Sequence, residues 1–311
     1  MTPMRQIIKI DASLLSKSSC MLQVYLQTYK SLAPGGADSV DLVFGSALHK
    51  FAEHWHKTGD NVMAQHEAIK FYNGVEKYTN AKNKHKNVPL LIEACNAYER
   101  AWLVKRELKS VKIVEDNGKP LVEYKFSIPY YSTDEFDIVL CGTIDQITCV
   151  DGRTYIINDI KTSTAYDRET YLNSYGMSSQ LMIYRMALEW HAREFPDSIY
   201  ATMLKGTIGC RILGVFCGAN KNVEVELSDI YWYPDSLVEE AKKVIKQKVD
   251  ILIDHIKSGT RPLKEGIITG ACYDFKRCPY FNACNSRTDR EMDNTLESQM
   301  VKKHYDPMLF R

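Results

Sequence analysis

The sequence predicts a mixed α/β fold, with a central mixed β-sheet flanked by helices and a helical insertion ahead of the sheet. Apolar residues recur with a helical period from Leu42 to about Arg106, and after residue 120 they alternate as they do in strands. Successive strands then enclose one further helix, an order typical of an α/β core. The 311 residues are 45% hydrophobic and 25% charged, which is enough for one large or two small domains.

The individual elements follow in order from these patterns. A short strand or turn opens the chain, and Ser13 is suited to cap the helix that comes next, before a loop at 33–39. We expect helices within 44–55, 63–78 and 90–108, strands at 121–130, 136–150 and 154–162, a helix at 171–194, strands at 201–209 and 223–233, and a helix at 236–258. Asp151 and Gly152 form the expected hairpin turn between the second and third strands.

Composition does not identify a binding partner, but it indicates the cellular compartment. The net charge is +1, so a surface for nucleic acid would have to come from a local patch. The sequence has no run of about 18 apolar residues and no signal-peptide pattern. We therefore expect no membrane partner and a cytoplasmic location. Nine cysteines, an odd number, argue against a full disulfide framework.

Two charged residues stand at the end of an apolar strand, in "IINDIKTS". Asp159 and Lys161 are two residues apart, so in a strand they point to the same face. A hairpin would bring Asp145, on the preceding strand, to the same end. Two such carboxylates repel each other unless a cation lies between them, and they suit Mg²⁺ or Mn²⁺. With Lys161 they form a minimal site for metal-assisted phosphodiester hydrolysis. The alternative is a half-exposed ion pair that contributes little.

Further polar residues accompany this group. Gln180 and Tyr184 are four residues apart on a predicted helix, so they share one face and can bind a phosphate or orient the lysine. His49, in "FGSALHKF", is a candidate metal ligand or base contact, and the alternative is a buried core histidine. Glu123, at the start of the first predicted strand, is a further candidate carboxylate.

The order of these residues resembles that of the PD-(D/E)xK nuclease superfamily, in its RecB-like branch. "GTID", "DIK" and "QLMIY" resemble the GxxD, (D/E)xK and QxxxY motifs, and "GSALH" resembles a G-x-x-x-H element ahead of the core. The resemblance implies a restriction-endonuclease-like core. The site residues that it implies are the metal ligands His49, Asp145, Asp159 and the backbone carbonyl of Ile160, the catalytic lysine Lys161, and the positioning residues Gln180 and Tyr184. Glu123 has a less certain counterpart and stays outside this set.

On this resemblance we expect a single nuclease domain over residues 1–311. Its expected parts are an N-terminal segment at 1–40 that carries Cys20, a helical insertion at 41–118, the nuclease core at 119–260, a cysteine-rich segment at 261–290 and a C-terminal tail at 291–311.

Three closely spaced cysteines near the end of the chain indicate a second metal site. Cys272, Cys278 and Cys284 lie in "CYDFKRCPYFNAC", and Cys20 is the candidate fourth ligand. CRISPR-associated nucleases and AddAB-type helicase–nucleases of the same branch bind a 4Fe–4S cluster through one N-terminal and three C-terminal cysteines, which this pattern resembles. The gap after Cys272 is five residues where the family commonly has two. Zn²⁺ and free thiols are the alternatives.

A basic stretch at 77–87 is the candidate nucleic-acid contact, with Lys77, Lys82, Lys84 and Lys86, although a solvated surface explains such a stretch equally well.

The function we expect is Mg²⁺- or Mn²⁺-dependent hydrolysis of DNA. An exonuclease on single strands or DNA ends in recombination, repair or replication is favoured, since the helical insertion and the cysteine tie would suit a strand with a free end. A helicase, a single-strand-binding protein or a recombination protein is a possible partner. The alternatives are a nuclease-fold subunit of a larger complex for helicase action or CRISPR adaptation, and a zinc-stapled DNA-binding protein without catalysis.

Overall fold

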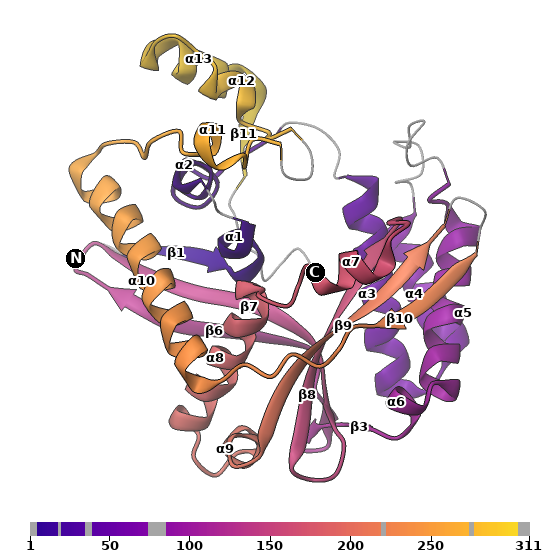
Figure 1. Cartoon of the computed structure of the whole chain (residues 1–311). Helices are drawn as coiled ribbons and strands as arrows, with labels where there is room; N and C mark the ends of the chain where they lie inside the picture. Colours follow the sequence, from indigo (N-terminus) through magenta and orange to yellow (C-terminus); the bar gives the residue numbers. More distant parts are fainter. Residues whose placement is uncertain are drawn as a thin grey trace. The chain divides into compact units, whose positions relative to one another are not determined.

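A mixed β-sheet flanked by helices organises the chain (Figure 1). Its strands pair in the order β1-β7-β8-β9-β10, and β3 and β6 also pair with β7. This computed structural model describes residues 5–17, 20–34, 39–73, 85–218, 222–273 and 277–303, without the side chains of residues 13, 16 and 17. The predicted α/β class is therefore confirmed.

The contacts of the chain divide it into two compact units. Unit 1 combines Met1–Gly36, Ser127–Gly142 and Pro234–Phe310, and unit 2 combines Ala37–Phe126 and Thr143–Tyr233. Unit 1 thus gathers segments from the beginning, the middle and the end of the sequence. The strands β6 (Val122–Ser132) and β7 (Phe136–Cys149) contribute residues to both units.

The predicted hairpin forms the centre of unit 2. The second half of β7 runs antiparallel to β8 (Thr154–Ser163), and the turn between them contains Gly152 at a φ of 84°. A parallel strand β9 (Thr207–Cys217) follows β8, and β10 (Val223–Leu227) runs antiparallel to β9. The short strands β3 (Lys112–Ile113), β4 (Glu115–Asp116) and β5 (Lys119–Pro120) precede β6.

The predicted helices of the insertion are present in unit 2 and pack together beside β8–β10 (Figure 1). They are α3 (Val40–Thr58), α4 (Asn61–Tyr72) and α5 (Val88–Val104), followed by the short α6 (Arg106–Lys109). Their apolar residues share one buried core with Ile160, Leu213 and Val215 of the sheet. Because successive residues of a strand alternate, burial of Ile160 in this core turns the neighbouring Asp159 and Lys161 away from it.

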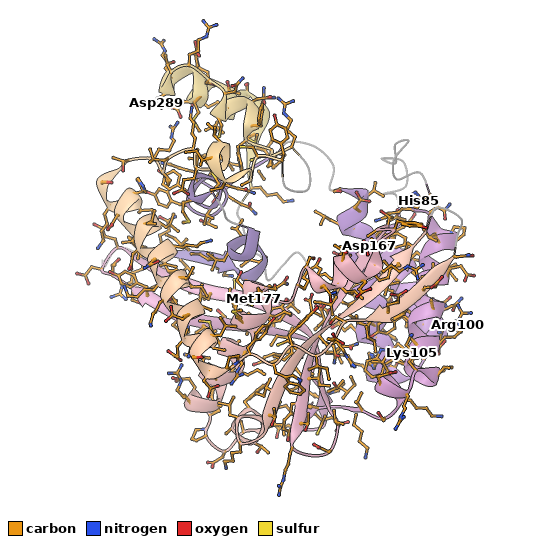
Figure 2. The ribbon with its side chains drawn as sticks, viewed as in Figure 1. His85, Arg100, Lys105, Asp167, Met177 and Asp289 are labelled. Atoms are coloured by element: carbon orange, nitrogen blue, oxygen red, sulfur yellow. The ribbon has the colours of Figure 1, made fainter. Side chains whose placement is uncertain are left out.

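The helix predicted at 171–194 is interrupted. The structure has α7 (Arg168–Asn173) and α8 (Ser179–Glu194), and the segment between them contains Gly176. The Tyr231 hydroxyl donates to the carbonyl of Leu172 at 2.8 Å, and a Cβ at Gly176 would lie 3.5 Å from the Tyr231 ring. Contact with Tyr231 therefore accompanies the break. In Figure 2, Asp167 marks the start of α7, and Met177 comes just before α8.

The strand predicted at 201–209 is wrong in its first half. Residues Ile199–Leu204 form α9, and β9 begins only at Thr207. The backbone turns at Gly206, where an added Cβ would lie only 2.1 Å from the carbonyl oxygen of Arg153. This close approach to the β7–β8 hairpin requires glycine and separates the helix from the strand.

In unit 1, the helix predicted after Ser13 is divided at Cys20. Strand β1 (Gln6–Asp11) lies parallel to the first half of β7, and three short helices follow, which are α1 (Ala12–Lys17), α2 (Met21–Val24) and the π-helix η1 (Tyr25–Tyr29). Cys20 is extended, with φ −144° and ψ 104°, and precedes α2. Such an extended residue ends the helical hydrogen-bond pattern.

The C-terminal part of unit 1 packs against this N-terminal part. Its elements are α10 (Asp235–Ser258), α11 (Gly266–Thr269), α12 (Phe281–Cys284), α13 (Asp289–Gln299) and β11 (Met300–Lys302), which pairs with β2 (Leu32–Pro34). The Tyr280 hydroxyl donates to the carbonyl of Leu32 at 2.6 Å, and Glu265 accepts from the backbone N–H of Met21 at 3.0 Å. No helix in the described part of the chain is both long and apolar enough to cross a bilayer.

A buried cation supports the sheet of unit 2. Arg211 on β9 is only 3% exposed, and its Nε and Nη2 both donate to Oδ1 of Asn158 on β8, at 3.0 and 2.8 Å. Asn158 in turn donates to the Thr148 hydroxyl at 3.0 Å. Burial lowers the pKa of Arg211 to about 10, so the guanidinium stays charged at neutral pH. The buried guanidinium therefore needs the side-chain oxygen of Asn158 as a hydrogen-bond acceptor.

We predict that Asn158→Leu lowers the free energy of unfolding by about 2–3 kcal/mol, because it removes the acceptor of a buried charged donor. Urea denaturation measures this change. The double variant Asn158→Leu/Arg211→Met removes the charge as well and should regain at least half of the loss. A single variant as stable as the wild type would contradict the proposed role of Asn158.

Candidate active site

Strands β7 and β8 part at the position of the two aspartates. Their paired residues run from Cys149 opposite Tyr155 to Gln146 opposite Asn158. Just beyond this pair, Oδ2 of Asp145 accepts the backbone N–H of Ile160 at 2.6 Å, so a side chain provides the acceptor. A carboxylate that accepts a backbone N–H makes a charge-assisted, strong hydrogen bond. Asp145 and Asp159 are both fully buried beside this point.

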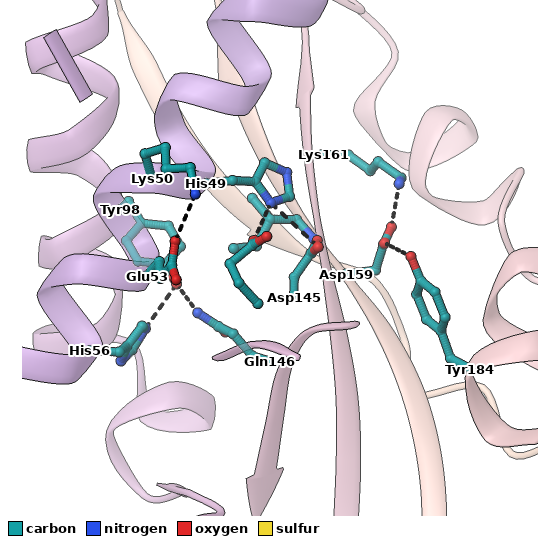
Figure 3. Close-up of polar contacts among 12 residues, drawn as sticks. His49, Lys50, Glu53, His56, Tyr98, Asp145, Gln146, Asp159, Lys161 and Tyr184 are labelled. Carbon is teal, nitrogen blue, oxygen red and sulfur yellow. Dashed lines mark hydrogen bonds and ion pairs between the residues drawn. The ribbon is translucent and has the colours of Figure 1, made fainter. Parts of the chain in front are cut away.

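Asp159 belongs to a closed ring of four polar side chains. Its Oδ2 lies 2.6 Å from Nζ of Lys161, which also donates to Oε1 of Gln180 at 3.3 Å. Gln180 donates to the Tyr184 hydroxyl at 2.6 Å, and Tyr184 donates to Oδ1 of Asp159 at 3.3 Å. Figure 3 shows Asp159 between Lys161 and Tyr184. The spacings i, i+2 on β8 and i, i+4 on α8 therefore bring together four of the residues that the sequence singled out.

His49 reaches the site from α3. Gly45 lies one turn before it, and a Cβ at Gly45 would be 3.2 Å from Oγ1 of Thr162, so α3 runs very close to the end of β8. The Nδ1 of His49 lies 2.8 Å from Oε1 of Glu123. It also lies 3.4 Å from Oδ1 of Asp145, and Figure 3 shows His49 directed at Asp145. The glycine of the "GSALH" pattern thus permits the close approach that places the histidine beside the carboxylates.

The ligand atoms of His49, Glu123 and Asp145 all lie within 4.8 Å of one another. Burial by itself would lower the pKa of His49, but the carboxylates of Asp145 and Glu123 raise it to about 10. The two carboxylates therefore bind a positive charge strongly. An imidazole with two carboxylates, each from a different element, is a donor set that suits a divalent metal ion such as Mg²⁺ or Mn²⁺.

Glu123 is the residue that sequence reasoning left outside the ligand set. Its backbone has a φ of 50°, a left-handed conformation that is unfavourable for a residue with a side chain, and its carboxylate is 5% exposed. The only signal in the sequence was its place at the start of β6. Ile160, predicted to contribute its carbonyl, lies between Asp159 and Lys161, with its side chain in the helical core and its N–H on Asp145.

The four cysteines that were predicted to be metal ligands lie together in unit 1. Cys20, Cys272, Cys278 and Cys284 line one cavity, whose wall also includes Lys264, Gly266, Tyr280 and Phe281. A Cβ added at Gly266 would lie 3.0 Å from Sγ of Cys272 and 3.6 Å from Cβ of Cys20. Burial and the neighbouring thiols raise the pKa of Cys284 to about 11. Despite its unusual spacing, Cys272 borders the same cavity as the other three.

Lys86 was predicted to be part of a nucleic-acid contact, but the structure places its side chain in a buried contact. Its ammonium lies 3.0 Å from Oδ1 of Asp41 and 5.3 Å from the Phe44 ring, its carbonyl accepts from the Tyr72 hydroxyl at 2.7 Å, and the residue is 5% exposed. A side chain buried in this way joins helices and does not contact a phosphate. Lys77, Lys82 and Lys84 lie outside the described residues.

In this protein a mixed sheet carries two aspartates and a lysine where adjacent strands separate, and a helix supplies a glutamine and a tyrosine. This arrangement defines a class of nuclease. The chain belongs to the PD-(D/E)XK nuclease superfamily, whose family model matches residues 14–285. This span includes every residue of the site in unit 2 and all four cysteines.

Comparison with individual proteins adds little to this assignment. Among curated proteins, none matches the chain. The chain is similar to a crystal structure from Eubacterium rectale whose description as an exonuclease is provisional, with 11% identity, a TM-score of 0.48, and coverage of 86% of this chain and 88% of that one. It is also similar to the protein SSO0001, with 10% identity, a TM-score of 0.27, and coverage of 74% and 84%. Both TM-scores are low, so neither likeness bears on activity.

We predict that Lys86→Met lowers the free energy of unfolding by about 1–2 kcal/mol, because the ion pair with Asp41 is lost. Affinity for single-stranded DNA, measured by fluorescence anisotropy, should stay the same. Lys70→Met is the control, since Lys70 lies on α4 with its side chain 70% exposed. Weaker DNA binding by Lys86→Met at unchanged stability would restore the original prediction for this residue.

Proposed function

We propose that this protein is a divalent-metal-dependent DNA nuclease that hydrolyses phosphodiester bonds. The observation that carries the proposal is that unit 2 contains both parts of such a site. One part is the His49, Glu123 and Asp145 cluster, and the other is the ring around Asp159 and Lys161. Asp145 connects the two parts through the backbone of Ile160. Membership of the PD-(D/E)XK nuclease superfamily supports this proposal.

The residues that would hold Mg²⁺ or Mn²⁺ are His49, Glu123 and Asp145, with Asp159 and the carbonyl of Ile160 completing the set. When bound, such an ion acts as a Lewis acid on the phosphate and makes a nearby water molecule more acidic. His49 would bind as the neutral imidazole, because a protonated ring nitrogen cannot be a ligand.

The four polar side chains around Asp159 have separate roles in the reaction. Hydrolysis forms a bond between a water oxygen and phosphorus, and it breaks the bond between phosphorus and the leaving sugar oxygen. One proton of the water is released and one equivalent is taken up by the leaving oxygen. The Lys161 ammonium donates hydrogen bonds to the phosphate oxygens, where negative charge grows in the transition state. Gln180 holds Lys161 in place, and Tyr184 holds the carboxylate of Asp159.

The form of the activity that we favour is an exonuclease on single-stranded DNA or DNA ends, in recombination, repair or replication in the cytoplasm of a bacterial or phage-infected cell. A helicase, a single-strand-binding protein or a recombination protein would supply the ends. The preference for ends rests on the sequence analysis, in which the helical insertion and the cysteine tie would suit a strand with a free end. DNA binding without cleavage, as a subunit of a larger complex, is the outcome that would replace it.

We predict that the wild type degrades end-labelled linear DNA in Mg²⁺ or Mn²⁺, and that EDTA stops the reaction. Lys161→Ala should lower kcat about 10²–10³-fold, because a donor to the transition state is lost. Glu123→Gln should raise the Mg²⁺ concentration for half-maximal rate about tenfold or more. Single-stranded, duplex and circular substrates are compared side by side.

Lys243→Ala is the control, because Lys243 is an exposed lysine on α10 that pairs with Glu240. Loss of linear but not circular DNA would identify an exonuclease, and cleavage of circles would identify an endonuclease. If wild type and Lys161→Ala both bind DNA and neither cleaves it, the catalytic proposal fails.

For the cysteine cavity of unit 1 we propose a 4Fe–4S cluster bound by Cys20, Cys272, Cys278 and Cys284. The proposal is supported by the cavity of unit 1, whose lining includes all four cysteines. In such a cluster each thiolate binds a different iron, whereas tetrahedral zinc binds all four thiolates on one ion. The role of the cluster would be to join the chain ends within unit 1.

We predict that anaerobically purified protein contains about four irons and four acid-labile sulfides per chain. Cys272→Ser should lower the iron content and the thermal midpoint, because a ligand is lost. Cys149→Ser is the control, since Cys149 is a half-buried free thiol on β7. About one zinc per chain, without sulfide, would contradict the cluster and favour the zinc alternative.

A further inference from the structure

The segment at 164–178 connects the two elements that carry the polar side chains of the site. It leads from β8, with Asp159 and Lys161, to α8, with Gln180 and Tyr184. It is held firmly against β9 and β10. Arg168 forms ion pairs with Glu224 and Glu226, and its guanidinium lies 5.4 Å from the Phe216 ring. The Tyr231 hydroxyl fixes the carbonyl of Leu172. A segment with these contacts can place a side chain accurately beside the site.

Tyr175 is the side chain that this segment presents to the catalytic lysine. Its ring centroid lies 5.8 Å from Nζ of Lys161, within the range of a cation–π interaction. Its hydroxyl donates to the Tyr171 hydroxyl at 3.0 Å, and the two rings meet edge to face at 5.5 Å. Tyr171 packs in turn on Phe216, with centroids 5.7 Å apart. The ring of Tyr171, which is itself packed on Phe216, therefore supports the ring of Tyr175.

The other partners of Lys161 explain why a third contact matters. Asp159 lies 2.6 Å from the ammonium and Gln180 lies 3.3 Å from it. If Asp159 turns its charge toward a divalent ion, the attraction that it exerts on Lys161 is shared, and the ion itself repels the ammonium. Gln180 and the ring of Tyr175 are then the contacts that keep the ammonium near its place. A neutral ring can do this without competing for the metal.

We propose that Tyr175 is a positioning residue for Lys161, which keeps the ammonium directed at the phosphate during hydrolysis. The inference rests on the proposed nuclease function and deepens it. The ring carries the effect, and the hydroxyl serves to fix the ring through Tyr171. Tyr175 itself need not touch the substrate. Its contribution therefore belongs to the chemical step and not to DNA binding.

Steady-state cleavage of a labelled single-stranded oligonucleotide in Mg²⁺ tests this role with two substitutions. Tyr175→Leu removes the ring and should lower kcat about 3- to 30-fold, the range of a cation–π interaction, with KM within about twofold of wild type. Tyr175→Phe keeps the ring and should retain kcat within about threefold. Tyr166→Leu is the matched control, because Tyr166 is a fully exposed tyrosine of the same segment, and its kcat should equal that of the wild type.

A second measurement does not depend on activity. The Cε protons of Lys161, observed by NMR with ¹³C-labelled lysine and assigned with Lys161→Arg, should be shifted upfield by the ring in wild type and Tyr175→Phe. The shift should disappear in Tyr175→Leu and persist when Mg²⁺ is added to wild type.

The outcomes separate this inference from the proposed function. An inactive wild type that still shows the upfield shift would overturn the nuclease proposal and, with it, the catalytic use of Tyr175, while the contact itself would stand. An active wild type with kcat unchanged in Tyr175→Leu, or with Tyr175→Phe as defective as Tyr175→Leu, would overturn the positioning role alone. A change confined to KM would assign Tyr175 to DNA binding and would equally contradict it.

Discussion

The site depends on the compensation of three buried carboxylates by two side-chain cations. Glu123, Asp145 and Asp159 are each at most 5% exposed at their side chains, and a buried carboxylate without a partner costs several kcal/mol. His49 lies against the first two, and Lys161 lies against the third. The cations come from different elements, a helix and a strand. The packing of α3 on β8 is therefore as important to the site as the hairpin that carries the aspartates.

The same compensation prepares the site for its proposed ion. The pKa of His49 is raised to about 10, against the effect of burial, which means that the surrounding carboxylates favour a positive charge at this position. A divalent ion would provide that charge in place of the proton. Glu123 contributes to this field from a strained backbone conformation, and such strain is found mostly where a side chain has a function.

In unit 1 too, contacts between residues that lie far apart in the sequence bring the candidate metal ligands together. Cys20 borders a cavity with three cysteines from the end of the chain, and nearby hydrogen bonds link Met21 to Glu265 and Leu32 to Tyr280. These contacts already hold the two chain segments together through backbone groups. A metal centre would add covalent ties to a junction that hydrogen bonds and a short β-pairing have formed.

The sequence alone determined the parts of the site that follow from local geometry. Residues two apart on a strand or four apart on a helix share a face, and a tight hairpin aligns neighbouring strand ends. Asp145, Asp159, Lys161, Gln180 and Tyr184 could be selected on those grounds, and the family resemblance agreed. The tertiary structure decided the rest. Glu123 meets His49 across 74 residues, Lys86 forms an ion pair with Asp41, and Tyr175 lies beside Lys161 in the segment between α7 and α8 that Tyr231 contacts. These features arise from packing between remote segments, which no short pattern of residues encodes.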